Sequence, residues 1–254
     1  MRKNTKKNLY SHRNFPDMSR KIYLIVTAGG SGTRMGADIP KQFLPLAGKA
    51  ILHRTIERFV EAQPGIRVIT VLPAAHIPLW KEYCQKAGFN QPQTIVEGGI
   101  TRFHSVRNAL AKVPDGAIAA IHDGVRPLIS IELIRTMFSQ MKEGTRALIP
   151  VIPTTDTLKS LAKVRLSDGT VGLEPTGEKA PERSFVWGAQ TPQIFLSEDI
   201  KAAYSLPFDT SFTDDASVAE AKKIPLSYTE GERFNIKITT PEDMLLAEAL
   251  IQRT

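Results

Sequence analysis

The first 150 residues alternate between short apolar runs and segments with helical spacing, and this alternation restricts the possible folds more than any other feature. Strands are predicted at residues 22–27, 67–72, 94–96, 118–122 and 146–152, and helices at 51–61, 77–87, 101–112 and 131–143. Strands that alternate with helices form parallel sheets, because each helix carries the chain back across one face of the sheet. We therefore expect an α/β, Rossmann-like fold with a mainly parallel, helix-flanked sheet, in a single domain over residues 22–254.

The alternation stops between Thr154 and Trp187. This segment, 154–187, has weak alternation, a turn signal at Asp168-Gly169 and too few apolar residues to form a core of its own. It is predicted to be a projecting β-arm that becomes ordered against a second subunit. Helices return at 197–205 and 214–222, followed by a strand at 224–229. Thr240, Pro241 and Asp243 then predict the capped start of a last helix.

The formal net charge of +7 comes almost entirely from the start of the chain. Residues 1–21 hold seven Lys and Arg residues against one acid, Asp17, which leaves a net charge of +1 for residues 22–254. We expect residues 1–21 to be a basic, disordered extension, with an RNA-binding arm as the alternative and with Met18 as a possible true start. Because the body is nearly neutral, no nucleic-acid partner is expected.

The location of the protein is predicted from two absences in the sequence. No apolar run approaches the roughly 18 residues that a membrane helix needs, and the basic leader lacks the apolar core of a secretory signal. The single cysteine, Cys84, excludes an internal disulfide and suits a reducing compartment. A cytoplasmic protein without a membrane partner is therefore expected.

The stretch "TAGGSGTRMGADIPKQF", Thr27 to Phe43, follows the first strand and has the composition of an anion-binding loop. Its glycines let backbone N–H groups approach an anion closely, and its arginine and lysine add full positive charges; these residues are Gly29, Gly30, Gly32, Arg34 and Lys41. Met35 stands where the dinucleotide fingerprint needs a third glycine, and no Gly-Lys-Ser/Thr sequence is present. A solvated surface loop is the alternative, but its place after the first strand of an α/β sheet favours a phosphate-binding loop.

The longer string "AGGSGTRMGADIPKQFLPLAGKAIL" resembles the signature of nucleotidylyltransferases that transfer a nucleoside monophosphate to a sugar or polyol phosphate. With Pro40-Lys41-Gln42 it resembles in particular the cytidylyltransferases that act on 2-C-methyl-D-erythritol 4-phosphate. Further stretches fit the same family in order; they are "EGGITRFHSV", "HDGVRPLIS", "ERSFVWGAQTPQIF", "TDDAS" and "NIKITTPEDMLLAEAL". The resemblance extends from about Ile22 to Leu250.

The resemblance implies a reaction and assigns the site residues to catalysis, to the nucleotide or to the acceptor. It implies transfer of CMP from CTP to 2-C-methyl-D-erythritol 4-phosphate, with Mg²⁺ or another divalent cation whose protein ligands are not assigned. Catalytic roles are implied for Arg34, Lys41, Arg183 and Lys237, and nucleotide binding for Ala28, Gly29, Gly30, Gly32, Gly98, Gly99 and Ser105. Contacts near the acceptor are implied for Asp123, Arg126, Thr157, Thr191 and Thr213. Because the family's arm crosses into a second subunit, Arg183 implies a homodimer with composite sites.

The residue types suit this chemistry. A phosphate monoester is largely dianionic at neutral pH, so the acceptor is already a nucleophile, and the site must instead neutralise charge with Arg, Lys and a metal ion. The five histidines are scattered and have no metal-binding spacing. Two positions depart from the family, because His104 replaces a common acid and Ile100 has no polar side chain. A ribitol 5-phosphate cytidylyltransferase and a catalytically silent nucleotide-binding module remain the alternatives.

Overall fold

The computed structural model describes residues 20–30 and 39–252. The predictions for Gly32 and Arg34, and most of the predicted tail, lie outside these described residues. Arg20 and Lys21 lie inside them and contact the folded body. Arg20 forms an ion pair of 3.3 Å with Glu198, and the carbonyl of Lys21 accepts a hydrogen bond of 2.9 Å from Ile118. These two residues, which the predicted extension 1–21 included, therefore lie with the body.

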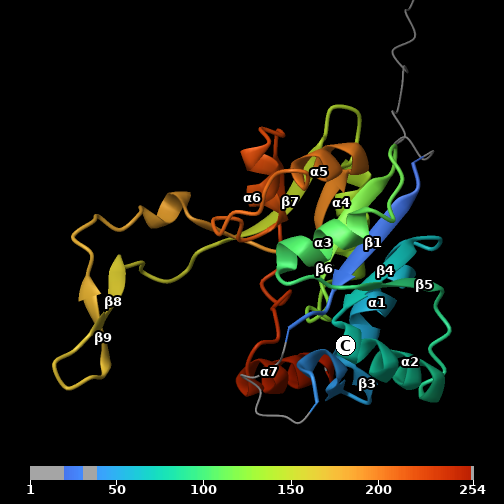
Figure 1. Ribbon diagram of the computed structural model, residues 1–254, viewed down its shortest axis with the longest axis horizontal. Coiled ribbons are helices and arrows are strands. Elements are labelled where there is room, and N and C mark those ends of the chain that lie inside the picture. The colour runs from blue at the N-terminus through green and yellow to red at the C-terminus, as the bar shows by residue number, and fades with distance from the viewer. Residues whose placement is uncertain (1–19, 31–38, 253–254) are drawn as a thin grey trace, which may run out of the picture.

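Eight strands of the described chain form one central sheet, in the order β10-β7-β11-β6-β1-β4-β5, with β12 paired to β7. The parallel core consists of β1 (Ile22–Thr27), β4 (Arg67–Leu72), β5 (Gln93–Glu97) and β6 (Ile118–Asp123). Beyond β6 lie β11 (Gln193–Leu196), β7 (Ala147–Pro153), β10 (Trp187–Ala189) and β12 (Ser227–Glu230). The predicted α/β fold with a mainly parallel sheet is confirmed (Figure 1).

The sheet departs from the prediction at β10 and β11, two antiparallel strands that were not predicted, and β11 matters more for the site. β11 is antiparallel to both of its neighbours, β6 and β7. β10 continues along β7 in the same antiparallel direction. The chain therefore leaves the arm, passes along β7 and enters the sheet between two strands that precede it in sequence.

Helices cover both faces of the sheet, which explains why its strands are apolar on both sides. Along β1, Ile25 packs into one core while Leu24 and Val26 pack into the other, because successive side chains of a strand point to opposite faces. The first core is closed by α3 (Arg102–Leu110), α5 (Ser197–Ala203) and α6 (Asp215–Ala221). The second is closed by α1 (Ile51–Ala62), α2 (Ile77–Lys86) and α4 (Ile131–Gln140).

The last helix, α7 (Pro241–Ile251), forms a smaller core with Leu46 of the short strand β2 (Pro45–Leu46), which pairs with β3 (Lys49–Ala50). Its predicted start is confirmed: Thr240 is the N-cap, Pro241 stands at the first position, and Thr240 and Asp243 form a capping box. This cap holds the chain directly after residues 235–238, which approach the carboxyl end of β6.

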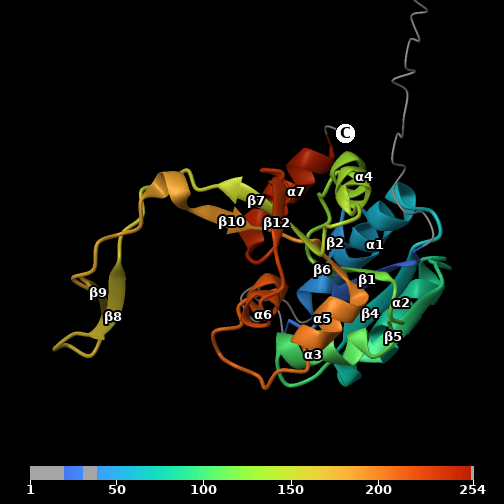
Figure 2. The same ribbon diagram turned by 90° about the horizontal axis from the view of Figure 1, so that it is seen from above.

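The predicted arm contains a hairpin that projects from the body. Its strands β8 (Leu161–Arg165) and β9 (Val171–Pro175) pair with each other, with Gly169 in the turn at a φ of 84°. Two perpendicular views show the hairpin well away from the sheet (Figures 1 and 2). Within residues 20–30 and 39–252, none of the helices has the length and apolar composition that crossing a bilayer requires.

Candidate active site

A cleft of about 500 Å³ lies at the carboxyl ends of the parallel strands, where ligands of α/β sheets collect. Four chain segments that follow successive strands of the parallel core meet there. Its lining residues include Ala28, Gly29 and Gly30 after β1, Pro73 after β4, Gly98 and Gly99 after β5, and Asp123 at the end of β6, together with Lys41, Arg102, Ser105 and Lys237. Most residues predicted to bind the nucleotide therefore share one cleft.

The half of the cleft that was predicted to bind phosphate is built mainly from backbone. The N–H of Ala28 donates to Val71 at 3.0 Å, and its carbonyl accepts from Nε2 of Gln42 at 2.8 Å. Gln42 thus ties the two described ends of the glycine-rich stretch together. The buried Lys41 lies beside Gly30, because a Cβ placed on that glycine would be 3.6 Å from Cε of the lysine.

The opposite wall is the turn between β5 and α3. The N–H of Gly99 donates to Oγ of Ser105 at 3.0 Å, and this hydroxyl donates to the carbonyl of Thr101 at 2.9 Å. A side chain at Gly99 is excluded, because its Cβ would lie 2.4 Å from Cβ of His104. Ile100 stands at the rim of the cleft with 96% of its surface exposed. This wall therefore presents backbone and apolar surface, as expected from its sequence.

Asp123 is the electrostatic centre of the site. Its carboxylate lies 3.1 Å from Nε of Arg126, 3.1 Å from Nζ of Lys237 and 3.8 Å from Nε of Arg102. Burial raises the pKa of Asp123, but the three cations outweigh burial and hold this pKa well below its usual range. Asp123 is therefore ionised at any physiological pH, and it places the ammonium of Lys237 at the cleft.

His122 and Thr191 position Asp123 from beneath. Burial lowers the pKa of His122 to about 3, so the ring is neutral. Its Nε2 lies 3.2 Å from the carbonyl of Arg126 and must carry the proton, since a carbonyl only accepts. Nδ1 then accepts from the Thr191 hydroxyl at 3.0 Å, and that hydroxyl accepts from the N–H of Asp123 at 3.1 Å. The observed role of Thr191 is to orient Asp123, and its predicted contact with an acceptor stays a prediction.

Sequence reasoning missed Arg102. Its guanidinium donates to both carboxylate oxygens of Asp215, at 2.8 and 2.7 Å, and Tyr204 donates to the same carboxylate at 2.5 Å. Burial lowers the pKa of Arg102, but Asp215 more than reverses this effect and the pKa is raised. Both charged residues stand inside stretches already noted, "EGGITRFHSV" and "TDDAS". The signal available in the sequence was a positive charge in the first stretch and a negative charge in the second, which could pair in the fold.

Two predicted acceptor residues, Thr157 and Thr213, and the predicted catalytic residue Arg183 lie away from this cleft. Thr157 and Arg183 are exposed on the arm, where Arg183 donates to the carbonyl of Thr155 at 3.1 Å. Thr213 lines a different groove of about 780 Å³, beside Trp187 and Tyr228. One chain therefore brings together the described residues that were predicted to bind the nucleotide with Asp123, Arg126 and Lys237, but not these three.

Known proteins were compared with the whole chain and its fold. The family model for 2-C-methyl-D-erythritol 4-phosphate cytidylyltransferase matches residues 22–253. The protein of that name from Bacteroides thetaiotaomicron is 41% identical over 231 residues, which are 91% of this chain and all of the relative. The one from Porphyromonas gingivalis is 43% identical over 235 residues, which are 92% of this chain and 99% of the relative.

A solved structure, 4-diphosphocytidyl-2C-methyl-D-erythritol synthase from Anaerococcus prevotii, has the same fold. It superposes with a TM-score of 0.71 at 28% identity, over 92% of this chain and 99% of that chain. The chain belongs to the 2-C-methyl-D-erythritol 4-phosphate cytidylyltransferase family. Membership confirms the resemblance seen in the sequence and agrees with the position of the cleft at the strand ends.

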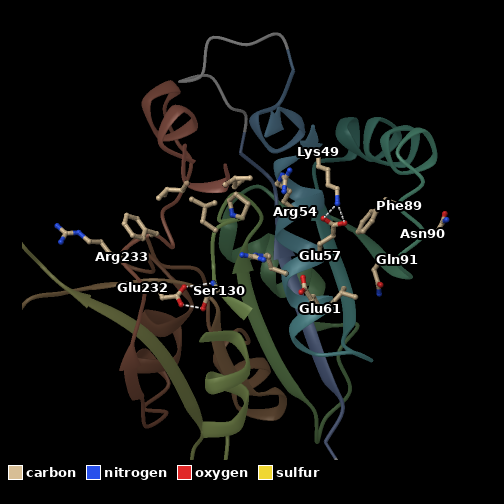
Figure 3. Close-up of a pocket in the computed structure, with 17 residues that line it drawn as sticks. Lys49, Arg54, Glu57, Glu61, Phe89, Asn90, Gln91, Ser130, Glu232 and Arg233 are labelled. Carbon is tan, nitrogen blue, oxygen red and sulfur yellow. Dashed lines mark hydrogen bonds and ion pairs between the residues drawn. The ribbon is translucent and has the colours of Figure 1, made fainter. Parts of the chain in front are cut away.

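This cytidylyltransferase family member also has a larger cavity, of about 1080 Å³, that shares no lining residue with the cleft (Figure 3). Size does not make it the candidate active site. The cleft holds the glycine backbone, Lys41 and Asp123, whereas the larger cavity is lined by α1 side chains and by loop and α7 residues.

The Arg102–Asp215 pair gives a stability prediction. Asp215→Asn is expected to lower the free energy of unfolding by roughly 3 kcal/mol, because it removes the counter-charge that the partly buried Arg102 contacts directly and leaves only Asp123, at 3.8 Å. Urea denaturation monitored by circular dichroism measures this change. Asp209→Asn is the control, since Asp209 is exposed and an asparagine can still accept from the N–H of Ser211. Equal stability of both variants and the wild type would contradict the role of the pair.

Proposed function

We propose that this chain transfers CMP from CTP to 2-C-methyl-D-erythritol 4-phosphate, giving 4-diphosphocytidyl-2-C-methyl-D-erythritol and pyrophosphate, in non-mevalonate isoprenoid biosynthesis. Family membership over residues 22–253 supports the reaction. The observation that carries the proposal is the cleft, in which glycine backbone and Lys41 lie opposite Asp123 with Lys237. A nucleoside triphosphate and a second anion both need positive charge of this kind.

The reaction requires the protein to neutralise the charge of the phosphates and to align the acceptor with CTP. An oxygen of the acceptor phosphate forms a bond to the α-phosphorus of CTP, while the bond from that phosphorus to the bridging oxygen breaks and pyrophosphate leaves. The attacking dianion carries no proton that a base must remove. In agreement, no histidine lines the cleft among the described residues, and His122 lies buried and neutral beneath it.

The charged residues then have separate tasks. Lys41, with Arg34 assigned from the sequence, neutralises charge on the reacting α-phosphate and on the departing pyrophosphate. Lys237 and Arg126 hold the acceptor phosphate beside it. Lys237 is suited to this task because its side chain is 43% exposed while Asp123 holds its ammonium in place.

The residues also fit a divalent cation, which we propose to be Mg²⁺. No group of three or more His, Cys, Asp or Glu residues in the described chain could hold a metal alone. Mg²⁺ in such sites is bound by one or two carboxylates together with substrate phosphates. Asp123, the carboxylate of the cleft, would supply the protein ligand, and the bound ion would add positive charge at the phosphates.

We further propose a cytoplasmic homodimer in which the arm of one subunit completes the other subunit's site. The hairpin pairs with itself, and the arm exposes Val171, Leu173, Phe185 and Trp187, by 50–79% of their surface. An isolated two-stranded hairpin is marginally stable, so packing on a second subunit would stabilise it. Arg183 and Thr157 would then reach an acceptor that their own cleft does not bring near them.

An acceptor panel tests the proposed reaction. With CTP and Mg²⁺, we expect pyrophosphate release with 2-C-methyl-D-erythritol 4-phosphate and much less with ribitol 5-phosphate. The relatives compared above are named for the former, so the ribitol alternative is not favoured. CTP binding without turnover of either acceptor would instead support the catalytically silent module.

Lys41 gives the second test. Lys41→Ala and Lys41→Met are each expected to lower turnover on the order of 10²–10³-fold, because stabilisation of transition-state charge is lost. CTP affinity should fall less, since backbone groups of Ala28 to Gly30 remain. Steady-state kinetics and calorimetry with CTP separate these effects, and Lys81→Ala on the exposed surface of α2 is the control. Near-wild-type turnover in both Lys41 variants would contradict the assignment.

Subunit mixing tests the composite site. Arg183→Ala and Lys237→Ala homodimers should each use the acceptor poorly but still bind CTP. After random exchange, half of the dimers are heterodimers with one fully wild-type site of two, so activity should recover to about one quarter of wild type. Mass spectrometry of the intact dimers verifies exchange. Demonstrated exchange without recovery would place both residues in the same subunit's site.

A further inference from the structure

The two oxygens of the Asp123 carboxylate have different surroundings. Oδ2 lies 3.1 Å from Nε of Arg126 and 3.1 Å from Nζ of Lys237. Oδ1 faces Arg102, whose Nε lies 3.8 Å away, which is too far for a hydrogen bond. No hydrogen bond to Oδ1 is formed within the described residues. Because a carboxylate oxygen accepts about two hydrogen bonds, the protein uses Oδ2 fully and leaves Oδ1 open to a ligand of the cleft.

Asp215 explains why Arg102 does not close on Asp123. Both terminal nitrogens of the guanidinium donate to Asp215, Nη1 to Oδ1 at 2.8 Å and Nη2 to Oδ2 at 2.7 Å. A hydrogen bond to Asp123 would require the guanidinium to move by about 1 Å. That movement would disrupt the two-pronged pair with Asp215, which is a particularly strong geometry for an arginine and a carboxylate.

The carboxylate of Asp215 is itself fixed. It is fully buried at the first position of α6, and it accepts from the hydroxyl of Tyr204 at 2.5 Å. The preceding residue, Asp214, forms a capping box with Ser217 that fixes the start of this helix. Arg102 begins α3, and its side chain is 31% exposed at the cleft. The guanidinium is therefore the partner that has room to move.

We propose that Asp215 is a positioning residue: it holds Arg102 away from Asp123 and so leaves Oδ1 of Asp123 open to the divalent cation that accompanies the nucleotide. This role rests on the proposed function, because that function requires the cation. When Asp215 loses its charge, Arg102 turns to Asp123 and occupies the oxygen that the cation needs. Asp215 is buried and acts only through Arg102.

A crystal structure of the Asp215→Asn variant tests the positioning role directly. The distance from Nε of Arg102 to Oδ1 of Asp123 is expected to fall from 3.8 Å to about 2.9 Å, the length of a charged hydrogen bond. This measurement needs neither metal nor turnover. An unchanged distance would overturn the proposal.

Binding of Mn²⁺, a paramagnetic substitute for Mg²⁺, tests the consequence for the cation. Water-proton relaxation of the full chain titrated with Mn²⁺ alone measures the dissociation constant. Asp215→Asn should weaken binding about tenfold, because the cation must first break a charged hydrogen bond between Arg102 and Asp123. The double variant Arg102→Gln, Asp215→Asn lacks the guanidinium and keeps the net charge of the wild type, so its affinity should recover. Asp123→Asn should abolish binding.

Two matched variants separate this role from a change of charge or a loosening of the fold. Glu97→Gln removes the same charge from an exposed residue directly before Gly98 of the cleft wall. Tyr204→Phe disturbs the same buried network but leaves Arg102 on Asp215. Both should bind Mn²⁺ within about twofold of the wild type. The proposal fails if either variant weakens binding as much as Asp215→Asn, or if the double variant does not recover.

Circular dichroism verifies that each variant is folded before binding is compared. If Asp215→Asn does not fold, Arg102→Gln decides the question. A competing guanidinium predicts that this variant binds Mn²⁺ at least as tightly as the wild type, and weaker binding would overturn the proposal.

The role of Asp215 and the proposed reaction can fail separately. In turnover assays, the Mg²⁺ concentration for half-maximal rate should rise in Asp215→Asn by the same factor as the Mn²⁺ dissociation constant. Crystallography and relaxation need no acceptor. Mn²⁺ binding that follows the expected order of variants in a chain without turnover would therefore contradict the proposed reaction alone. Wild-type protein without Mn²⁺ binding that depends on Asp123 would overturn the role of Asp215.

Discussion

The structure of the site depends on keeping one buried carboxylate charged. Removing a carboxylate from water is costly unless cations and hydrogen bonds compensate for the lost hydration. Asp123 receives this compensation from Arg102 at the start of α3, Arg126 in the turn after β6, and Lys237 before α7. Two segments that are distant in sequence, those of Arg102 and Lys237, are thereby fixed to the end of one central strand. Lys237, which is proposed to face the acceptor phosphate, and the loop at the start of α3, which is proposed to contact the nucleotide, are therefore both held by Asp123.

The inserted strand β11 explains how the chain reaches that anchor. Because β11 runs antiparallel beside β6, the residues just before it lie level with the carboxyl end of β6. Thr191 there accepts from Asp123, and Gln190 exchanges two hydrogen bonds with the backbone of Glu232, at 2.8 and 3.1 Å. Asn235 in turn donates to the carbonyl of Thr191 at 2.9 Å. The residues before the antiparallel strand β11 thus hold the segment that ends in Lys237 beside the carboxyl end of β6.

The sequence predicted what depends on local pattern and missed what depends on distant contacts. The parallel strands and their helices were predictable, because runs such as 22–27 are buried on both faces and α1 and α4 have regular apolar spacing. β11 is only four residues long, Gln193–Leu196, and periodicity cannot separate so short a run from a loop or helix end. Arg102 was missed for a related reason, since Asp215 lies 113 residues away. Thr191 was noticed, but the hydrogen bonds of its hydroxyl with Asp123 and His122 were not predicted, because those residues lie 68 and 69 positions away in the sequence.

The two halves of the cleft are therefore encoded differently. The half proposed to bind the nucleotide is formed by backbone groups within short stretches. Gly99 fits there and a larger residue would collide with His104, so the sequence of this half is recognisable on its own. The half proposed to bind the acceptor is formed by long side chains that meet only after β11, α6 and the segment before α7 are in place. In the proposed dimer this dependence extends one step further, because Arg183 would join the acceptor half only when the arm packs on a second subunit. Assembly of the dimer and completion of the acceptor site would then be the same structural event, whereas the nucleotide half would be complete in each chain alone.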